Sequence, residues 1–208
     1  MASMKDIFDS VNAKEERDNL GITKEQQGDP KATKADEKKE KFHQEATKVY
    51  DTASGEALLT MDYVKGNEGY SSKIYNDTEE LETIGYGFRI KDETTRSLLP
   101  TDVVNGKRDL TKEEADSVFK KRFKIAMSDA VSYMGGQDNF TKLTKSQKKG
   151  LIDMSYNMGL TSLNGFDDLR KALFLGDNLK AKEEVLNSKY AREDVPNRAK
   201  QNANLMLR

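Results

Sequence analysis

The chain of 208 residues contains no cysteine and a single histidine, His43. The absence of cysteine excludes disulfides, thiolate zinc sites and cysteine nucleophiles. His43 lies in a strongly charged tract, so serine–histidine catalysis and histidine-rich metal sites have little support. The groups that remain for chemistry are carboxylates, hydroxyls, lysines and arginines.

The sequence also lacks an excess of charge of either sign and any long apolar run. Its 35 basic and 36 acidic residues leave a formal net charge of -1, which gives no basis for a nucleic-acid or membrane-surface partner. No apolar run approaches the length of a membrane span, and the start, MASMKDIFDS, is too polar for a signal peptide. We therefore expect no membrane insertion.

The beginning of the chain differs in composition from the rest. Apolar side chains at helical spacing in residues 1–12 predict a short amphipathic helix, which packs either on the protein itself or on another protein. Lys, Glu, Asp and Gln dominate residues 13–49, which cannot form a core of their own. We expect residues 1–54 to be a charged extension, extended or helical, that acts as a docking segment or linker. Residues 55–208 are then the folded domain.

Beyond the extension, the hydrophobic pattern predicts a small sheet followed by helices. An apolar segment at 56–66 predicts a helix, and β-prone runs at 73–75 and 83–88 predict short strands around a polar turn. The sheet is expected to be an antiparallel hairpin. A small sheet lobe with a mostly helical lobe is an α+β arrangement.

Two capping boxes mark the starts of long helices. Thr111 with Glu114, and Thr144 with Gln147, have the spacing at which each side chain bonds the backbone of the other residue. The second helix is the most apolar of the chain, and Gly159 is its expected end. The helices expected after it cover 167–175, 177–190 and a last segment that starts at Pro196.

The stretch from Glu68 to Gly87, EGYSSKIYNDTEELETIGYG, carries two carboxylates on different local elements and a nearby hydroxyl. Glu68 follows an apolar helix, where partial burial raises the pKa of a carboxyl group so that it holds its proton. Asp77 lies in a polar turn that keeps it ionised, and Thr83 follows close enough to hold a water beside it. This set fits glycosidic bond hydrolysis, with ordinary surface carboxylates as the alternative.

These residues resemble the catalytic segment of phage T4-type lysozyme. Residues 150–159 with 165–170 are similar to that family's central buried helix and the turn after it, and residues 188–200 are similar to its C-terminal segment. The resemblance covers about residues 56–208 and implies a lysozyme-like fold. It also implies a muramidase that cleaves the β-1,4 bond between N-acetylmuramic acid and N-acetylglucosamine in peptidoglycan, with inversion and with no cofactor or metal ion.

The resemblance also implies roles for individual residues. Glu68 is the expected general acid, Asp77 the carboxylate that activates or orients the water, and Thr83 the residue that helps to place that water. A nearby cation lowers a carboxyl pKa, so burial or other charges must offset any cation beside Glu68. The other expected site residues are the substrate contacts Tyr156, Asn157 and Arg89, and Arg198, which the family pairs with the catalytic glutamate.

The sequence departs from the family pattern in the hairpin. Phe88 stands where a histidine is usual, and Arg89 stands where an aliphatic substrate contact is usual. Residues 79–82 occupy a turn that commonly contains a glycine. These departures concern the geometry of the hairpin and its substrate contacts more than the acid and the base.

Three other functions compete with a muramidase. A lytic transglycosylase works with a single glutamate, so the presence of Asp77 and Thr83 disfavours it. The intact Glu68 also disfavours a non-catalytic virion protein that keeps only the fold. Nucleic-acid binding through residues 120–124, KKRFK, is less consistent with the balanced charge than a solvated helix face.

The charged extension bears on where the protein acts. A free endolysin waits in the host cytoplasm before lysis and needs no anchor, whereas an enzyme carried in a virion must be held there. Residues 1–54 suit attachment to a virion or tail protein. We therefore expect a virion- or tail-associated enzyme that acts on the bacterial cell wall, with a free endolysin as the alternative.

Overall fold

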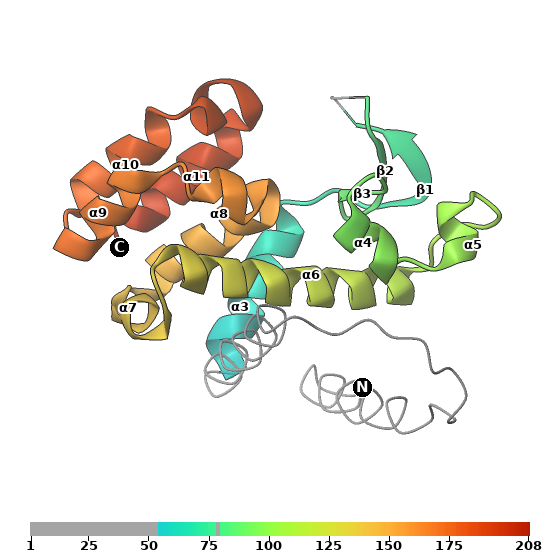
Figure 1. The fold of residues 1–208 in the computed structure, drawn as a ribbon, viewed down its shortest axis with the longest axis horizontal. Helices are drawn as coiled ribbons and strands as arrows, with labels where there is room; N and C mark the ends of the chain where they lie inside the picture. Colours follow the sequence, from blue (N-terminus) through green and yellow to red (C-terminus); the bar gives the residue numbers. More distant parts are fainter. Residues whose placement is uncertain (1–53, 78–79) are drawn as a thin grey trace, which may run out of the picture. The chain divides into compact units, whose positions relative to one another are not determined.

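A computed structural model describes residues 54–77 and 80–208 (Figure 1). The expected extension lies outside the described residues except for Ser54, so its boundary and its docking role stay predictions. In the described part of the chain, no helix is both long and apolar enough to cross a membrane.

The described residues form one helix, then a small sheet and then a series of helices, which confirms the expected α+β class. In chain order the elements are α3 (Ser54–Gly66), β1 (Ser71–Asn76), β2 (Glu82–Gly85), β3 (Phe88–Arg89), α4 (Glu93–Leu98), α5 (Thr101–Val104), α6 (Lys112–Tyr133), α7 (Gln137–Lys142), α8 (Lys145–Leu163), α9 (Asp167–Leu175), α10 (Asn178–Leu186), the π-helix η1 (Tyr190–Asp194) and α11 (Pro196–Met206).

The sheet has three antiparallel strands in the order β1-β2-β3. Tyr75 on β1 lies opposite Thr83 on β2, and Ile84 on β2 lies opposite Phe88 on β3. The predicted strand at 83–88 is therefore two strands joined by a tight turn. Gly85 takes a positive φ of 64° there, and a side chain at this position would lie 2.5 Å from the ring of Phe88. Glycine is thus required where the chain reverses.

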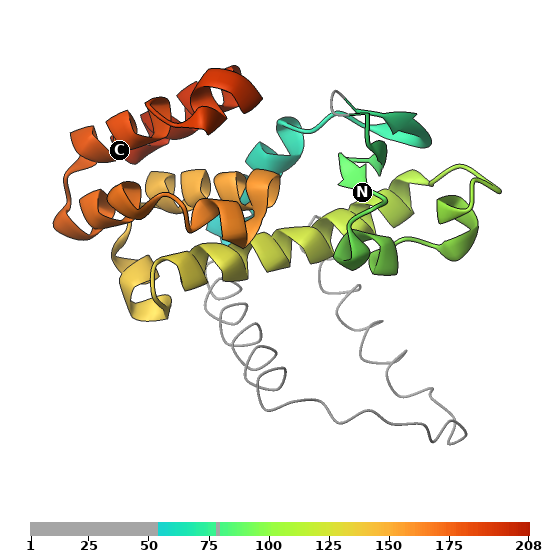
Figure 2. The same cartoon turned by 45° about the horizontal axis from the view of Figure 1, so that its top comes forward.

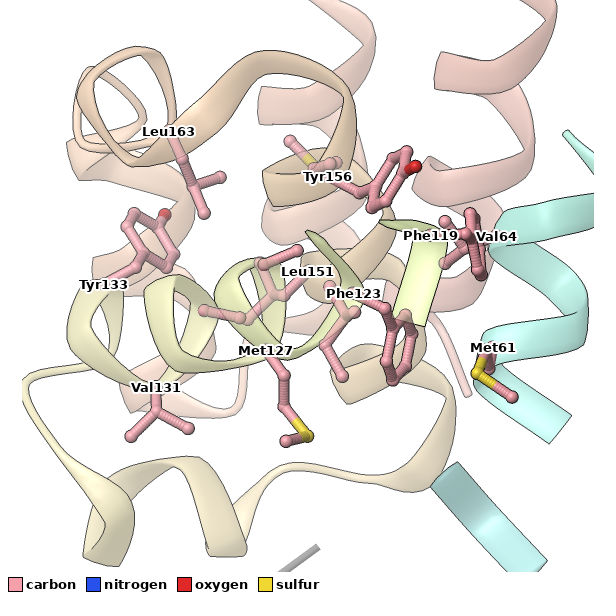
Figure 3. Packing of buried hydrophobic residues seen from close by; sticks show 14 of the residues in the cluster. Met61, Val64, Phe119, Phe123, Met127, Val131, Tyr133, Leu151, Tyr156 and Leu163 are labelled. Atoms are coloured by element: carbon pink, nitrogen blue, oxygen red, sulfur yellow. The ribbon is translucent and has the colours of Figure 1, made fainter. Parts of the chain in front are cut away.

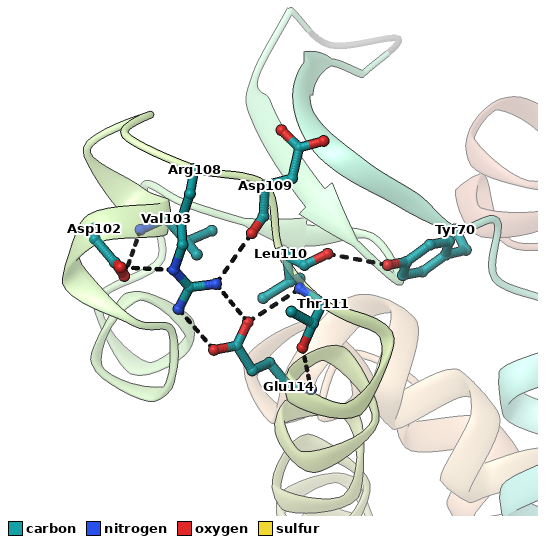
Figure 4. A network of polar contacts seen from close by, with 8 residues as sticks. All are labelled: Tyr70, Asp102, Val103, Arg108, Asp109, Leu110, Thr111 and Glu114. Carbon is teal, nitrogen blue, oxygen red and sulfur yellow. Dashed lines mark hydrogen bonds and ion pairs between the residues drawn. The ribbon is translucent and has the colours of Figure 1, made fainter.

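Helix α6 begins next to the sheet and continues into the helical part of the fold (Figure 2). Its predicted capping box is confirmed, because Thr111 accepts a bond from the N–H of Glu114 and Glu114 accepts one from the N–H of Thr111. Arg108 reinforces this start with bonds of 2.8 and 2.7 Å to the two Glu114 carboxylate oxygens (Figure 4). Tyr70, just before β1, donates to the carbonyl of Leu110 at 3.2 Å and ties the sheet to the helix start.

The core lies mainly between α6 and α8, with α3 against them (Figure 3). Phe119 and Phe123 on α6 are buried with Leu151 on α8, and Val64 joins them from α3. Burying an aliphatic or aromatic side chain of this size stabilises a fold by about 1.5 to 3 kcal/mol. Leu59, although part of the apolar pattern of α3, is 66% exposed. The core thus anchors the end of α3, from which Glu68 follows.

The later helices follow the predicted order with two corrections. The capping box of α8 is confirmed, but the helix continues past Gly159 to Leu163 with a kink at Gly159, whose φ is 74°. Leu163 is fully buried, which explains why the chain turns back into a helix there. Helix α10 ends at Leu186, earlier than expected, and η1 follows it. Pro196 occupies the first turn of α11, as predicted.

Candidate active site

Glu68 lies in the short link between α3 and β1. The backbone N–H of Glu68 bonds to the carbonyl of Lys65 at 3.2 Å, which continues the last turn of the helix. Val64, one turn earlier, is fully buried and holds this end of α3 in place. The Glu68 side chain is 13% exposed. A buried helix end therefore carries a carboxyl group that is largely removed from water.

Arg198 on α11 joins Glu68 to a second carboxylate. Its Nη1 donates to Glu68 Oε1 at 2.6 Å, while Nε and Nη2 each donate to Asp153 at 2.8 Å. The Arg198 side chain is 9% exposed, and Asp153, on α8, is fully buried. A bidentate arginine–carboxylate pair of this kind is geometrically specific. The structure thus brings Arg198 to Glu68; the functional role of each stays a prediction.

Two asparagines complete the surroundings of Asp153. Asn202 on α11 donates to Asp153 at 2.7 Å, and Asn67, beside Glu68, donates to it at 3.1 Å. Asn202 also donates to the hydroxyl of Tyr190 at 3.1 Å and accepts a bond from Tyr63 at 3.1 Å. Every member of this cluster is bonded to another, which is the condition for a buried polar network to hold one geometry.

The pKa of Glu68 is raised above the ordinary glutamate value. Burial is the largest cause and favours the protonated form. Arg198 opposes it through its charge and its hydrogen bond, Asp153 raises the pKa, and the charge of Arg122 lowers it. Burial and the charge of Asp153 therefore outweigh the lowering of the Glu68 pKa by Arg198 and Arg122. A general acid at this position requires such a balance.

The second oxygen of Glu68 faces the turn between β2 and β3. Gly87 has a φ of 71°, and a Cβ atom built on it would lie 3.0 Å from Glu68 Oε2. A side chain at this position would therefore be strained and would press on the carboxyl group. The turn leaves space for the one Glu68 oxygen that does not accept the Arg198 bond.

Asp77 follows directly after β1 and is held from three sides. The N–H of Leu81 donates to its Oδ1 at 3.0 Å, and Arg89 Nε on β3 donates to its Oδ2 at 3.1 Å. The Thr83 hydroxyl lies 3.4 Å from the same Oδ2 and 2.9 Å from the carbonyl of Leu81. Thr83 is buried, with an exposed fraction of 2%. The hairpin therefore folds back and brings Asp77 and Thr83 together.

Tyr75 connects the two carboxylates electrostatically. Its pKa is raised first by burial and then by the negative charges of Asp77 and Glu68. One phenol on β1 is thus close enough to be influenced by both groups, although Tyr75 is 40% exposed.

The expected substrate contacts differ in accessibility. Asn157 is exposed on α8. Tyr156 is 6% exposed, and its ring lies 5.2 Å from that of Phe119, so it is part of the core as well as a neighbour of Glu68. The side chain of Arg89 is 44% exposed and bonds to Asp77. Contact of these three residues with a substrate stays a prediction.

Three residues near the carboxylates were not predicted: Asp153, Tyr75 and Arg122. The sequence contains a signal for the first of them. Asp153 stands between Ile152 and Met154 in the most apolar helix of the chain, and a charged residue at a buried position is almost always paired. Tyr75 and Arg122 lie in ordinary strand and helix patterns, and no local signal marks them.

A pocket of about 820 Å³ lies elsewhere in the described part of the chain. Its walls come from the end of α8, α9, α10 and η1, and they include Phe166, Tyr190, Asp168 and Lys189. None of the expected catalytic residues lines it. Glu68, Asp77 and Thr83 therefore lie outside this hollow.

Comparison with known proteins supports the sequence resemblance. The phage lysozyme family model matches residues 65–201, more than half of the chain and a range that includes Glu68, Asp77, Thr83 and Arg198. The chain is also 26% identical over 128 residues to the pre-baseplate central spike protein Gp5 of Enterobacteria phage T4. That match covers 57% of this chain and 22% of the relative. The chain belongs to the phage lysozyme family, as the resemblance predicted.

Proposed function

We propose that the protein is a peptidoglycan hydrolase that cleaves the β-1,4 bond between N-acetylmuramic acid and N-acetylglucosamine. Membership of the phage lysozyme family supports glycoside hydrolase activity in general. The observation that carries the proposal is Glu68, which is buried and fixed by Arg198 while its pKa remains raised. A carboxyl group with a raised pKa keeps its proton at pH values at which an ordinary glutamate is already ionised.

Glu68 is the general acid in this proposal. Arg198 occupies Oε1, so Oε2 is the oxygen that carries the proton. The proton passes to the glycosidic oxygen as the bond to the anomeric carbon breaks. Arg198 then stabilises the carboxylate that remains, because its Nη1 already donates to Oε1 and needs no rearrangement to pair with the new charge.

Asp77 is the base. The Leu81 N–H and Arg89 favour its ionised form and fix its orientation. A water held between Asp77 and Thr83 attacks the anomeric carbon from the face opposite the leaving oxygen and gives its proton to Asp77. The new bond forms on the opposite face from the broken one, so the reaction inverts the anomeric configuration.

The products of digestion test this function. Purified protein and purified peptidoglycan are expected to give fragments with hydrated N-acetylmuramic acid ends, identified by mass spectrometry. Fragments with anhydro ends would identify a lytic transglycosylase instead. If no fragments form and wild type behaves like Glu68→Gln, the protein is a non-catalytic member of the family.

The relative supports a second element of the proposal, that the protein is carried in a phage virion. Gp5 is named as a central spike protein of the pre-baseplate. Residues 1–54 are the proposed attachment to a virion or tail protein, and the folded domain acts on the cell wall. Deletion of residues 1–54 is expected to leave turnover of soluble wall fragments largely intact and to abolish incorporation into particles. Normal incorporation of the truncated protein would favour a different attachment or a free endolysin.

A further inference from the structure

Asp153 is a carboxylate that shares the guanidinium of Arg198 with Glu68. Its carboxylate is fully buried in α8 and accepts two bonds from Arg198, one from Asn202 and one from Asn67. The two oxygens share these bonds equally, two on each. A buried charge is retained only when it is paired and hydrogen-bonded, and Asp153 meets both conditions.

The guanidinium of Arg198 is shared unequally between its two carboxylates. Asp153 takes two of the donors in a bidentate pair, and Glu68 takes one. Arg198 carries one positive charge and Asp153 one negative charge. The two bonds between them have the same length, 2.8 Å. The Arg198–Asp153 pair is therefore close to neutral as a unit, while its Nη1 still donates to Glu68.

We propose that Asp153 is a positioning residue that offsets the charge of Arg198, so that Arg198 fixes the Glu68 carboxyl group without withdrawing its proton. The inference rests on the proposed role of Glu68 as the general acid. An arginine beside a carboxyl group normally has two effects: it orients the group and it favours the ionised form. In this proposal Asp153 weakens the second effect and leaves the first.

The balance of charge around Glu68 depends on this one aspartate. Arg198 and Arg122 both favour ionised Glu68, and Asp153 opposes them. Removal of Asp153 would leave two cations acting on Glu68 against burial alone. The charged or titratable groups that face Glu68 are Arg198 on α11, Arg122 on α6, Asp153 and Tyr156 on α8, and Tyr75 on β1.

The test is the pH profile of peptidoglycan turnover by the full chain with Asp153→Asn. The amide keeps the shape of the side chain and removes its charge, so the alkaline limb of the profile is expected to move down by about one pH unit or more. Asn202→Ala is the matched control, since it removes a donor from the same network and no charge. A purely structural role predicts that both variants lose stability and that neither moves the alkaline limb; that result would overturn the proposal.

The single variant Asp153→Asn leaves the buried charge of Arg198 without its bidentate carboxylate partner and could therefore misfold. The double variant Asp153→Asn with Arg198→Gln avoids this, because it leaves no unpaired buried charge. The alkaline limb is expected to return to or above its wild-type position. An alkaline limb that stays at the position of the single variant would contradict the proposal that Asp153 offsets the charge of Arg198.

A titration of the Glu68 carboxyl carbon by ¹³C NMR, in wild type and Asp153→Asn, separates this inference from the proposed function. A lower Glu68 pKa in the variant supports the inference even if neither protein degrades peptidoglycan, in which case the proposed function alone fails. An unchanged Glu68 pKa refutes the inference even if wild type is fully active.

Discussion

The Arg198 guanidinium and the Glu68 carboxyl group lie 2.6 Å apart, although 130 positions separate them in the sequence. The bond joins the last helix to the end of α3 and fixes one oxygen of Glu68. Burial nevertheless keeps the Glu68 pKa raised, so the pair orients the carboxyl group while leaving it protonated over a wider pH range than an exposed glutamate. This combination is what the proposed acid step requires.

The raised pKa of Glu68 predicts how stability changes with pH. The folded protein holds this proton to higher pH than the unfolded chain does, so the free energy of unfolding falls as pH rises from the unfolded to the folded pKa. Glu68→Gln cannot ionise. We expect it to gain stability relative to wild type through this window, by about 1.4 kcal/mol per unit of pKa shift, and to keep that gain at higher pH. Urea denaturation of both proteins from pH 4 to 8 measures the difference. A gain that shrinks as pH rises would contradict a raised pKa.

Gly87→Ala is expected to impair catalysis through Glu68. The substitution forces a side chain into a positive φ, at a cost of about 1 to 2 kcal/mol, and places Cβ 3.0 Å from Glu68 Oε2. Displacement of the acid by this contact is expected to reduce turnover by about 100-fold. Gly106→Ala is the matched control, since Gly106 has a φ of 66° and no neighbour within 4 Å. If both variants lose equal stability and keep equal turnover, the contact with Glu68 has no catalytic importance.

Arg89→Leu tests whether Arg89 acts on Asp77 or on the substrate. The bond of 3.1 Å to Asp77 predicts that loss of the cation moves the acid limb of the turnover profile to higher pH. The shift is expected to be small, because Arg89 is 44% exposed and solvent screens the pair. Arg89→Lys keeps the charge and should hold the limb nearer its wild-type position. A raised KM with an unchanged acid limb would identify a substrate contact instead.

Asn157 and Tyr156 are adjacent in sequence, but their substitution by alanine is expected to affect different properties. Asn157 is exposed, so Asn157→Ala is expected to raise KM several-fold while stability changes by less than about 0.5 kcal/mol. Tyr156 is buried against Phe119, so Tyr156→Ala is expected to cost about 3 to 5 kcal/mol of stability. Thermal unfolding and steady-state kinetics of both variants check this. An unchanged KM for Asn157→Ala would remove Asn157 from the substrate site.

Features that depend on neighbouring residues in the chain were predictable from the sequence. Both capping boxes and the start of α11 at Pro196 arise from contacts within a few positions, and the structure confirms them. The kink at Gly159 was not predicted, because glycine commonly follows the end of a helix, and the burial of Leu163 beyond the kink is not visible in the local sequence.

The candidate site depends on contacts that no local pattern encodes. Asp153 meets Asn67 across 86 positions and Arg198 across 45, so these contacts form only when α8, α11 and the link after α3 come together. The bond from Arg89 to Asp77 likewise depends on how the turn within residues 83–88 divides the predicted strand in two. The residue pattern alone selected Glu68, Asp77 and Thr83, the family resemblance gave them the roles of acid, base and water-holding residue, and these roles stay predictions.

Turnover of purified peptidoglycan by wild type and by Glu68→Gln tests the central claim most directly. Glutamine fills the same space and accepts the Arg198 bond through its carbonyl oxygen, but it has no acidic proton to give. Wild type is expected to release soluble fragments, and the folded variant is expected to release them at least about 100-fold more slowly. A folded Glu68→Gln variant with wild-type turnover would contradict the assignment of Glu68 as the acid.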